Sequence, residues 1–364
     1  MSNLACGFVG LPNVGKSTLF NALTRKQIPS ENYPFCTIDP NLGIVNVIDP
    51  RLQTLSNISH SQKIIYATVS FVDIAGLVKG ASQGEGLGNQ FLSHIRETDA
   101  IIQIVRCFED PNVIHVAGKV DPLQDIEVIQ LELILADLQM VENTVQRLEK
   151  QAKGKKELLP TIEFLKKAQA HLNQNLPMRA LPFTPEEEAI ARLYPFLTRK
   201  KMLYVCNVGE NDLPALNNPL VERVRVYAAK EGSGVVPICA RIEEEISRLD
   251  EKDAAEFLQS LGLKESGLDR LIREAFSLLG LATFITTGEI ETRAWTIQRG
   301  TTAAAAAGKI HSDIEKGFIR AEIVSFDDMV RYKGRVGARE AGKARSEGRE
   351  YIVQDGDVIL FFHS

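Results

Sequence analysis

The amino-acid sequence predicts an α/β protein with a doubly wound, mostly parallel sheet, an inserted helical hairpin and a small α+β domain at the C-terminus. Three observations support this fold class: short apolar runs separated by helical stretches, a long stretch with helical periodicity in mid-chain, and a change of texture near the end. With 364 residues, 44% of them apolar, the chain can form two or three hydrophobic cores.

The strands of the predicted sheet are runs rich in β-branched residues. They are almost continuously apolar, which is typical of parallel strands covered on both faces. These runs are 7–9, 43–48, 68–72, 101–105, 203–205 and 235–238. Helical stretches at 17–24 and 89–96 separate some of them, as in a doubly wound sheet.

The periodicity changes between residues 125 and 201. Apolar residues such as Ile126, Ile129 and Leu133 recur at three- and four-residue steps, with Lys, Arg and Glu between them, and the series restarts at Leu159 after Gly154. This pattern predicts a long antiparallel helical hairpin inserted between two strands. A packed insertion with no activity of its own is the simpler interpretation of these residues.

The C-terminal part begins after two predicted helical regions, at about 243–261 and 268–279. From Leu281 onward the sequence predicts short strands, a small helix and a turn at 355–357 before the last strand. The predicted elements are strands 283–286, 294–298, 319–324 and 358–362 and helix 303–310. They form a separate small α+β domain.

Charge and cysteine usage exclude several classes of protein. A net charge of −5 does not favour binding to DNA through bulk charge, although a local basic patch remains possible. No stretch resembles a membrane span or a signal peptide. The five cysteines are far apart and form no CxxC pair, which argues against disulfides and zinc and favours a reducing cytoplasm.

Residues 10–17, Gly-Leu-Pro-Asn-Val-Gly-Lys-Ser, fit the phosphate-binding motif G-x-x-x-x-G-K-[ST] between a strand and a helix. Glycines let backbone amides close around phosphate oxygens, and the start of the helix adds positive potential. We expect Lys16 to reach the β- and γ-phosphates and to act in catalysis, and the Ser17 hydroxyl to bind Mg²⁺. The nucleotide-binding residues expected here are Asn13, Val14, Gly15, Lys16, Ser17 and Thr18.

Asp73 ends a buried strand and is closely followed by Gly76. With the phosphate loop upstream, Asp73 is predicted to hold the metal and the Gly76 amide to sense the γ-phosphate. Thr37, in the loop between them, is the candidate for a further protein ligand of Mg²⁺. Taken alone, Asp73 could be a helix cap, and the Thr37 loop a rigid Pro-containing connector. The glycines at 80–88 suit either a mobile switch or a plain loop.

The segments 10–17, 32–40 and 73–78 resemble the YchF/Obg-like ATPase family, in the Obg branch of the translation-factor-related P-loop NTPases. The resemblance covers essentially the whole chain. It implies a nucleotide-binding domain formed by 1–124 and 202–280, a helical insertion at 125–201, and a TGS domain of β-grasp type at 281–364. It also implies slow hydrolysis of ATP in preference to GTP, contact with the ribosome, and a link to translation and oxidative-stress regulation.

The base preference can also be argued from residues. Guanine-specific relatives use Asn-Lys-x-Asp, in which the Asp accepts two hydrogen bonds from guanine. Here the fifth strand leads into Asn207-Val208-Gly209-Glu210, which lacks the lysine and has a longer acid. Dedicated hydrogen bonding supplies about 10⁴-fold discrimination, and this site should lose it. We expect Asn207 to serve a purine nitrogen, the Val208 backbone to meet an adenine amino group, and Glu210 to complete the base site. A partial mimic at 118–121 lacks the leading Asn.

Hydrolysis needs a group that orients the attacking water. Ras-like enzymes place a glutamine after the switch glycine, but Leu77 stands at that position here. His115 is the candidate replacement, and the family resemblance points to it as well, although a lone His in an apolar run is more often structural. Asn13 resembles the P-loop Asn that binds K⁺ in some related NTPases, so K⁺ is a second candidate cation beside Mg²⁺.

The partners expected are ATP, GTP more weakly, and the ribosome, through its large subunit or rRNA. Basic residues in the C-terminal domain and in the hairpin could contact phosphate backbones, although a solvated basic loop explains the former equally well. They are Lys333, Arg335, Arg339, Lys343, Arg345 and Arg349 in the former, and Arg147, Lys150, Lys153, Lys155 and Lys156 in the latter. We expect a monomer without a DNA or membrane partner.

Two alternatives to a slow ATPase stay open at this stage. They are a GTPase in ribosome assembly and a non-catalytic, nucleotide-gated switch that binds RNA or the ribosome. Cys36, beside Thr37, is a candidate redox handle on the switch loop, although packing alone could explain a cysteine there.

Overall fold

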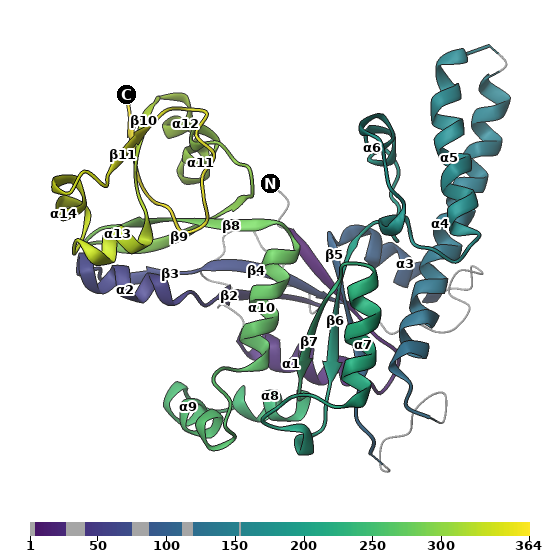
Figure 1. Ribbon diagram of the computed structural model, residues 1–364, viewed down its shortest axis with the longest axis horizontal. Coiled ribbons are helices and arrows are strands. Elements are labelled where there is room, and N and C mark those ends of the chain that lie inside the picture. Colours follow the sequence, from purple (N-terminus) through teal and green to yellow (C-terminus); the bar gives the residue numbers. More distant parts are fainter. Residues whose placement is uncertain (1–3, 27–40, 75–86, 111–118, 153) are drawn as a thin grey trace. The chain divides into compact units, whose positions relative to one another are not determined.

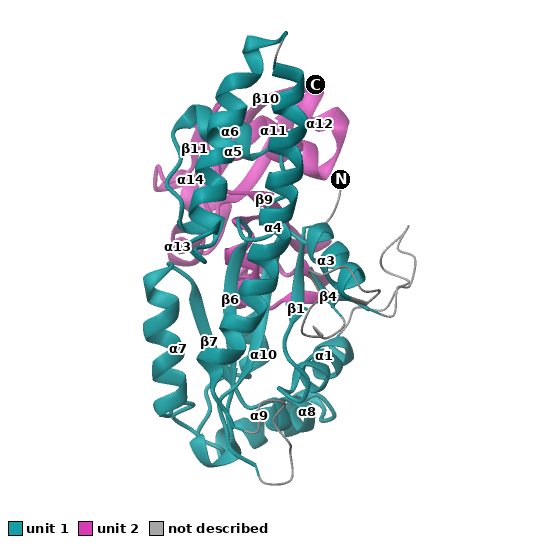
Figure 2. Ribbon diagram, turned by 90° about the vertical axis from the view of Figure 1, so that its right-hand side faces the viewer, with its two compact units in different colours: residues 1–43, 70–271 teal, residues 44–69, 272–364 magenta. Residues whose placement is uncertain are grey.

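A computed structural model describes residues 4–26, 41–74, 87–110, 119–152 and 154–364. The chain forms two compact units (Figure 2). The first contains residues 1–43 and 70–271, and the second contains residues 44–69 and 272–364. No helix within the described ranges is long and apolar enough to cross a lipid bilayer.

One six-stranded sheet has the strand order β2-β4-β1-β5-β6-β7. Its strands are β1 (Ala5–Val9), β2 (Leu42–Val47), β4 (Ala67–Asp73), β5 (Ala100–Arg106), β6 (Lys201–Asn207) and β7 (Gly234–Ile238). The pairs of β1 with β4 and β5, of β5 with β6, and of β6 with β7 are parallel. Every residue of β1 and β5 is buried, as expected for strands covered on both faces. The six predicted strands are therefore confirmed.

Helices follow these strands (Figure 1). They are α1 (Lys16–Arg25), α3 (Leu87–Glu97), α7 (Pro219–Lys230), α8 (Ala240–Ile246), α9 (Glu251–Ser260) and α10 (Gly267–Leu278). The prediction of continuous helix over about 243–261 is wrong, because α8 ends at Ile246 and α9 begins at Glu251. The Asp250 carboxylate accepts a hydrogen bond from the Asp253 amide at 2.9 Å, which starts a new helix.

The predicted helical hairpin is confirmed as α4 (Pro122–Ala152) and α5 (Leu159–Leu172), which lie side by side in Figure 1. Lys166 pairs with Glu149 at 2.6 Å and Gln169 with Glu142 at 3.4 Å, so the two helices run antiparallel. They share a hydrophobic cluster of their own. The short helix η3 (Lys156–Leu158) lies between them, and after α5 the chain continues through η4 (Met178–Ala180) and α6 (Pro185–Ala191).

The second unit contains a sheet with the order β11-β10-β12-β8-β9-β3. Its strands are β3 (Lys63–Ile65), β8 (Leu281–Thr287), β9 (Glu291–Gln298), β10 (Phe318–Val324), β11 (Arg345–Glu347) and β12 (Val358–His363). Its helices are α2 (Pro50–Ser59), α11 (Ala303–Ile310), α12 (Ser312–Lys316), α13 (Phe326–Arg331) and α14 (Arg335–Glu340). The predicted strands 283–286, 294–298, 319–324 and 358–362 lie within β8, β9, β10 and β12.

One strand of this sheet comes from far away in the sequence. β3 pairs in parallel with β9, with Lys63 opposite Glu291 and Ile65 opposite Arg293. This strand was not predicted from the sequence, because three residues carry no readable periodicity. On the β8–β9 side, the alanines of α11 share a hydrophobic cluster with Phe284 and Ile297.

Candidate functional site

The phosphate loop connects β1 to α1 in the predicted way. Gly15 is the N-cap of α1 with φ of 97°, and Asn13 also has a positive φ of 64°. The first turn of α1 contains no acidic residue, and the cap makes no side-chain hydrogen bond. Backbone amides and the positive end of the helix are therefore available to an anion.

Two glycines of the motif are required by close contacts. A Cβ on Gly10 would lie 2.9 Å from a Val14 methyl group and 3.0 Å from the Ile104 carbonyl oxygen. A Cβ on Gly15 would collide with the side-chain amide of Asn207, and its φ already disfavours other residues. The glycines thus let the loop pack directly against β5 and the end of β6.

Lys16 and Asp73 meet at the start of α1. The parallel register of β1 and β4 places Phe8 opposite Asp73, and the Lys16 ammonium contacts the Asp73 carboxylate. The two side chains are only 11% and 23% exposed. Ser17 lies in the first turn of α1, with an exposed side chain. The structure thus brings together the predicted phosphate lysine and one predicted metal ligand.

The donor set near Lys16 suits Mg²⁺. This ion prefers oxygen ligands, keeps several waters and usually takes one or two protein ligands beside phosphate oxygens. A hydroxyl on Ser17 and a carboxylate on Asp73 meet that need. Among the described residues there is no group of three or more His, Cys, Asp or Glu side chains that could hold a metal by themselves. Thr37, Gly76 and His115 lie outside the described residues, as do Cys36 and Leu77.

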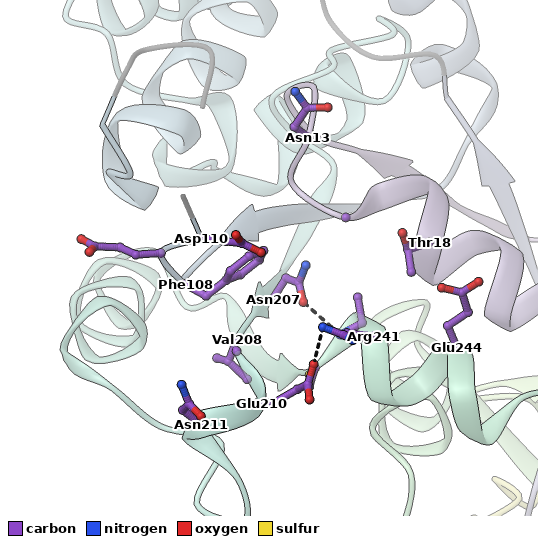
Figure 3. Close-up of a pocket in the computed structure, with 15 residues that line it drawn as sticks. Asn13, Thr18, Phe108, Asp110, Asn207, Val208, Glu210, Asn211, Arg241 and Glu244 are labelled. Atoms are coloured by element: carbon purple, nitrogen blue, oxygen red, sulfur yellow. Dashed lines mark hydrogen bonds and ion pairs between the residues drawn. The ribbon is translucent and has the colours of Figure 1, made fainter. Parts of the chain in front are cut away.

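A cavity of about 670 Å³ adjoins the phosphate loop (Figure 3). It begins at Asn13, Gly15 and Thr18 and extends to Val208 and Glu210. Its size falls in the range of about 300–1,000 Å³ that is usual for small-molecule sites. Residues predicted to bind the phosphates and residues predicted to bind the base therefore line one cavity.

Asn207 joins the two ends of this cavity. It is 4% exposed, and its side-chain amide donates to the Val14 carbonyl at 2.9 Å. Its side-chain oxygen accepts from the Ala240 amide, also at 2.9 Å. The amide nitrogen carries a second hydrogen that can serve a purine nitrogen. Asn207 therefore both fixes the loop and can read the base.

Val208 and Glu210 differ sharply in their surroundings. Val208 is 2% exposed and packs into the hydrophobic core, and its N–H donates to the Ile238 carbonyl at 2.9 Å. Its carbonyl is thus the group that could accept from an amino group on a base. The Glu210 side chain is 47% exposed and forms an ion pair of 2.9 Å with Arg241, drawn in Figure 3.

Phe108 in the cavity wall, and Arg106 beside it, were not predicted from the sequence. Phe108 lines the cavity, and Arg106, at the end of β5, is 1% exposed. The Arg106 guanidinium lies 4.6 Å from the centre of the Phe108 ring and donates to the Phe108 carbonyl at 3.0 Å and to the Asp110 carbonyl at 3.3 Å. An arginine at the end of an apolar strand is the sequence signal that could have indicated this contact. The Arg106 guanidinium holds the Phe108 ring in place.

Neither the cavity cysteine nor the partial guanine motif supplies chemistry here. Burial raises the pKa of Cys239, which lines the cavity, so its thiol stays protonated at neutral pH. Asp121, from the partial motif, accepts a hydrogen bond from Leu123 at the start of α4 and pairs with Arg223 at 3.0 Å. Asp121 therefore has a structural role and is absent from the residues that line the cavity.

Comparisons with known proteins agree with this site. A family model described as a 50S ribosome-binding GTPase matches residues 5–153. The YchF-GTPase_C model, described as a protein of unknown function, matches residues 281–363. Proteins named ribosome-binding ATPase YchF are similar along nearly their whole length. The one from Escherichia coli O157:H7 is 55% identical over 357 residues, and the one from Bacillus subtilis is 52% identical over 360 residues, each with 98% of both chains covered.

A solved structure extends the likeness to three dimensions. The Schizosaccharomyces pombe YchF GTPase is 36% identical, with 100% of this chain and 98% of that chain covered and a TM-score of 0.87. This agreement confirms the predicted fold class and the predicted family resemblance. With such similarity over almost its full length, the chain belongs to the YchF family.

Proposed function

We propose that the chain binds ATP with Mg²⁺, hydrolyses it slowly to ADP and phosphate, and associates with ribosomes. The observation that carries the nucleotide part is the cavity that runs from Asn13, Gly15 and Thr18 of the phosphate loop to Glu210, with Lys16 in contact with Asp73 at the start of α1. The relatives' name, ribosome-binding ATPase YchF, supports both parts.

Different residues are proposed to bind the phosphates, the metal ions and the attacking water. The amides of the phosphate loop and the Lys16 ammonium bind the phosphates, and Ser17 and Asp73 would hold Mg²⁺, with Thr37 as a further proposed ligand. The ion would neutralise charge on the phosphates. Gly76 and His115 keep their proposed roles at the γ-phosphate and the attacking water. K⁺ near Asn13 is a second proposed cation.

Preference for ATP over GTP is the finer part of the proposal. A buried Val208 cannot act as the lysine of a guanine motif, and the Glu210 carboxylate already pairs with Arg241. Asn207 can bond to any purine, while the Val208 carbonyl suits an amino group such as that of adenine. These features support adenine, and competition between ATP and GTP for the site tests them directly.

Ribosome contact is best supported at the tip of the hairpin. Arg147, Lys150, Lys155 and Lys156 are all exposed there, and a surface of this kind suits phosphate backbones. In the C-terminal domain, for which we propose the TGS assignment, several of the predicted cations already have partners. Arg335 and Arg339 both pair with Glu322, at 3.2 Å and 2.9 Å, and Arg345 lies 3.5 Å from Glu347.

Single-turnover hydrolysis of ATP and of GTP, with and without purified ribosomes, tests this function. We expect faster turnover of ATP than of GTP, a requirement for Mg²⁺, and ribosome binding that weakens as salt rises.

His115→Ala should lower turnover while leaving ATP affinity intact. Hydrolysis of neither nucleotide would contradict the enzyme, and salt-insensitive binding would contradict the electrostatic contact. Large stimulation by ribosomes would favour a nucleotide switch over a constitutive ATPase.

The cellular setting belongs to the same proposal. We place the chain in the cytoplasm as a monomer, and the division into domains 1–124 with 202–280, 125–201 and 281–364 is proposed with it. The four described cysteines are buried free thiols, in keeping with a reducing compartment. The link to oxidative stress is proposed from the family resemblance, with Cys36 as a candidate redox handle.

A further inference from the structure

The acid at the base end of the cavity already has a cationic partner from the chain itself. We infer that Arg241 is a specificity-determining residue, which strengthens the preference for adenine over guanine by occupying the Glu210 carboxylate. This inference rests on the proposed preference for ATP and identifies an ion pair that contributes to that preference.

The geometry brings the pair together from two separate elements. Glu210 begins the short helix η5 (Glu210–Asp212) after β6, and Arg241 lies in the first turn of α8. The distance from Arg241 Nη1 to Glu210 Oε1 is 2.9 Å, whereas Arg241 Nε lies 4.0 Å from Glu245. Glu210 is therefore the closer carboxylate. Both residues line the cavity, as Figure 3 shows.

A hydrogen bond made by the preceding residue also fixes where the backbone of Arg241 lies. The preceding residue, Ala240, donates its amide to the Asn207 side chain at 2.9 Å, and Asn207 in turn bonds to the Val14 carbonyl. Arg241 thus leaves the backbone directly beside the residue expected to bond to the base. A longer or displaced turn would not bring its guanidinium to Glu210.

The chemistry of the two bases explains the consequence. Guanine presents two adjacent donors, its N1–H and its 2-amino group, and a free Glu210 carboxylate could still accept from one of them, although the longer side chain is not expected to accept from both as the Asp of a guanine motif does. A guanidinium presents an equivalent pair of donors. Arg241 already bonds to Glu210 Oε1 and therefore competes with guanine for this carboxylate. Adenine has an acceptor at N1 and gains nothing from a free carboxylate there, so the ion pair weakens guanine binding more than adenine binding.

The size of the effect follows from exposure. The Arg241 side chain is 74% exposed and that of Glu210 is 47% exposed. Solvent-exposed ion pairs are screened and contribute little. We therefore expect a change of about two- to fivefold in the ratio of guanine to adenine affinity, and not the several orders of magnitude that a complete guanine motif supplies.

The test compares dissociation constants for ADP and GDP, which carry the same phosphate tail, in the full-length chain. Arg241→Met keeps an apolar stem and removes the charge, and it should raise the affinity for GDP relative to ADP by about two- to fivefold. Adding Glu210→Gln to that variant should abolish the gain. Arg225→Met is the matched control, because Arg225 is 44% exposed and pairs with Glu222 at 3.5 Å on α7.

Ionic strength gives an independent readout. Salt weakens an exposed pair, so the GDP-to-ADP affinity ratio of the wild type should rise between low and high salt, while that of Arg241→Met should stay level. An unchanged ratio in Arg241→Met, or an equal loss of both affinities, would overturn the inference while the ATP preference of the wild type stands. A wild type without adenine preference would instead overturn the proposed base preference.

Discussion

The two ends of the nucleotide cavity are built in different ways. At the phosphate end, the loop after β1 and the start of α1 place Gly15, Lys16 and Ser17 within a few consecutive residues. At the base end, Asn207, Phe108 and Arg241 come from three separate segments that meet only in the folded protein. The first end is a local motif, whereas the second is a product of tertiary structure.

This difference has a physical consequence. Backbone amides and a lysine recognise a polyphosphate whatever base it carries, so the phosphate end should supply most of the affinity. The base end has Glu210, an exposed acid that is already paired, and Asn207, a buried amide that can bond to a base. It should therefore supply selectivity of modest size. Substitutions at each end can separate the affinity for the phosphates from the selectivity for the base.

The largest effect is expected from Lys16→Met. This change removes the cation at the phosphate end while keeping the length of the side chain, and it should lower kcat/KM for ATP by about 100-fold or more. The affinity for tripolyphosphate, which has no base, should fall as well. Steady-state kinetics and calorimetry measure both. Lys252→Met on α9 is the control, since its side chain is 84% exposed. Unaltered tripolyphosphate binding in Lys16→Met would contradict the division between the two ends.

Asn207→Ala should affect both ends together. It leaves the Val14 carbonyl and the Ala240 amide without their buried partner, and each unsatisfied group costs about 1–3 kcal/mol. We expect the free energy of unfolding to fall by about 2–4 kcal/mol, with equal losses of ATP and GTP affinity. Chemical denaturation and calorimetry give these values. Asn211→Ala, on the exposed rim of the same cavity, should stay within about 0.5 kcal/mol of the wild type.

Gly15→Ala tests the close approach between the two ends. The new Cβ would need a positive φ and would meet the Asn207 amide. Gly232→Ala has a similar φ of 68° but open space around its Cβ, so it isolates the backbone cost of about 1 kcal/mol. The extra loss of unfolding free energy in Gly15→Ala should be about 1–3 kcal/mol. Equal losses in the two variants would mean that Asn207 moves aside easily.

The sequence predicts locally encoded features, such as those at the phosphate end, better than features that depend on tertiary contacts. The predicted strands and the placement of Lys16 beside Asp73 were within reach, because buried parallel strands are continuously apolar and the phosphate motif is contiguous. The break between α8 and α9 was missed, although Asp250 is a recognisable N-cap residue. The prediction rests on a composition rich in Glu, Asp and Leu, which is the same on both sides of the break.

Other features depend on contacts that no local pattern encodes. β3 has three residues and finds its partner in β9, with Lys63 opposite Glu291. The pairing of Glu210 with Arg241 arises only when the segment after β6 and the start of α8 come together. The sequence could identify Glu210 as the acid of a base site, but its partner became visible only in the structure.

The smallest effect is expected from Phe108→Ala, and it tests the base end by itself. The ring is held by the Arg106 guanidinium 4.6 Å away and forms part of the cavity wall. Aromatic contacts of this kind contribute about 0.5–1.5 kcal/mol, so the affinity for ADP should fall by about two- to tenfold. The affinity for tripolyphosphate should be unchanged, because the phosphate end is intact. A parallel loss of tripolyphosphate affinity would mean that the Phe108 wall supports the phosphate loop, and the two ends could then no longer be regarded as separable.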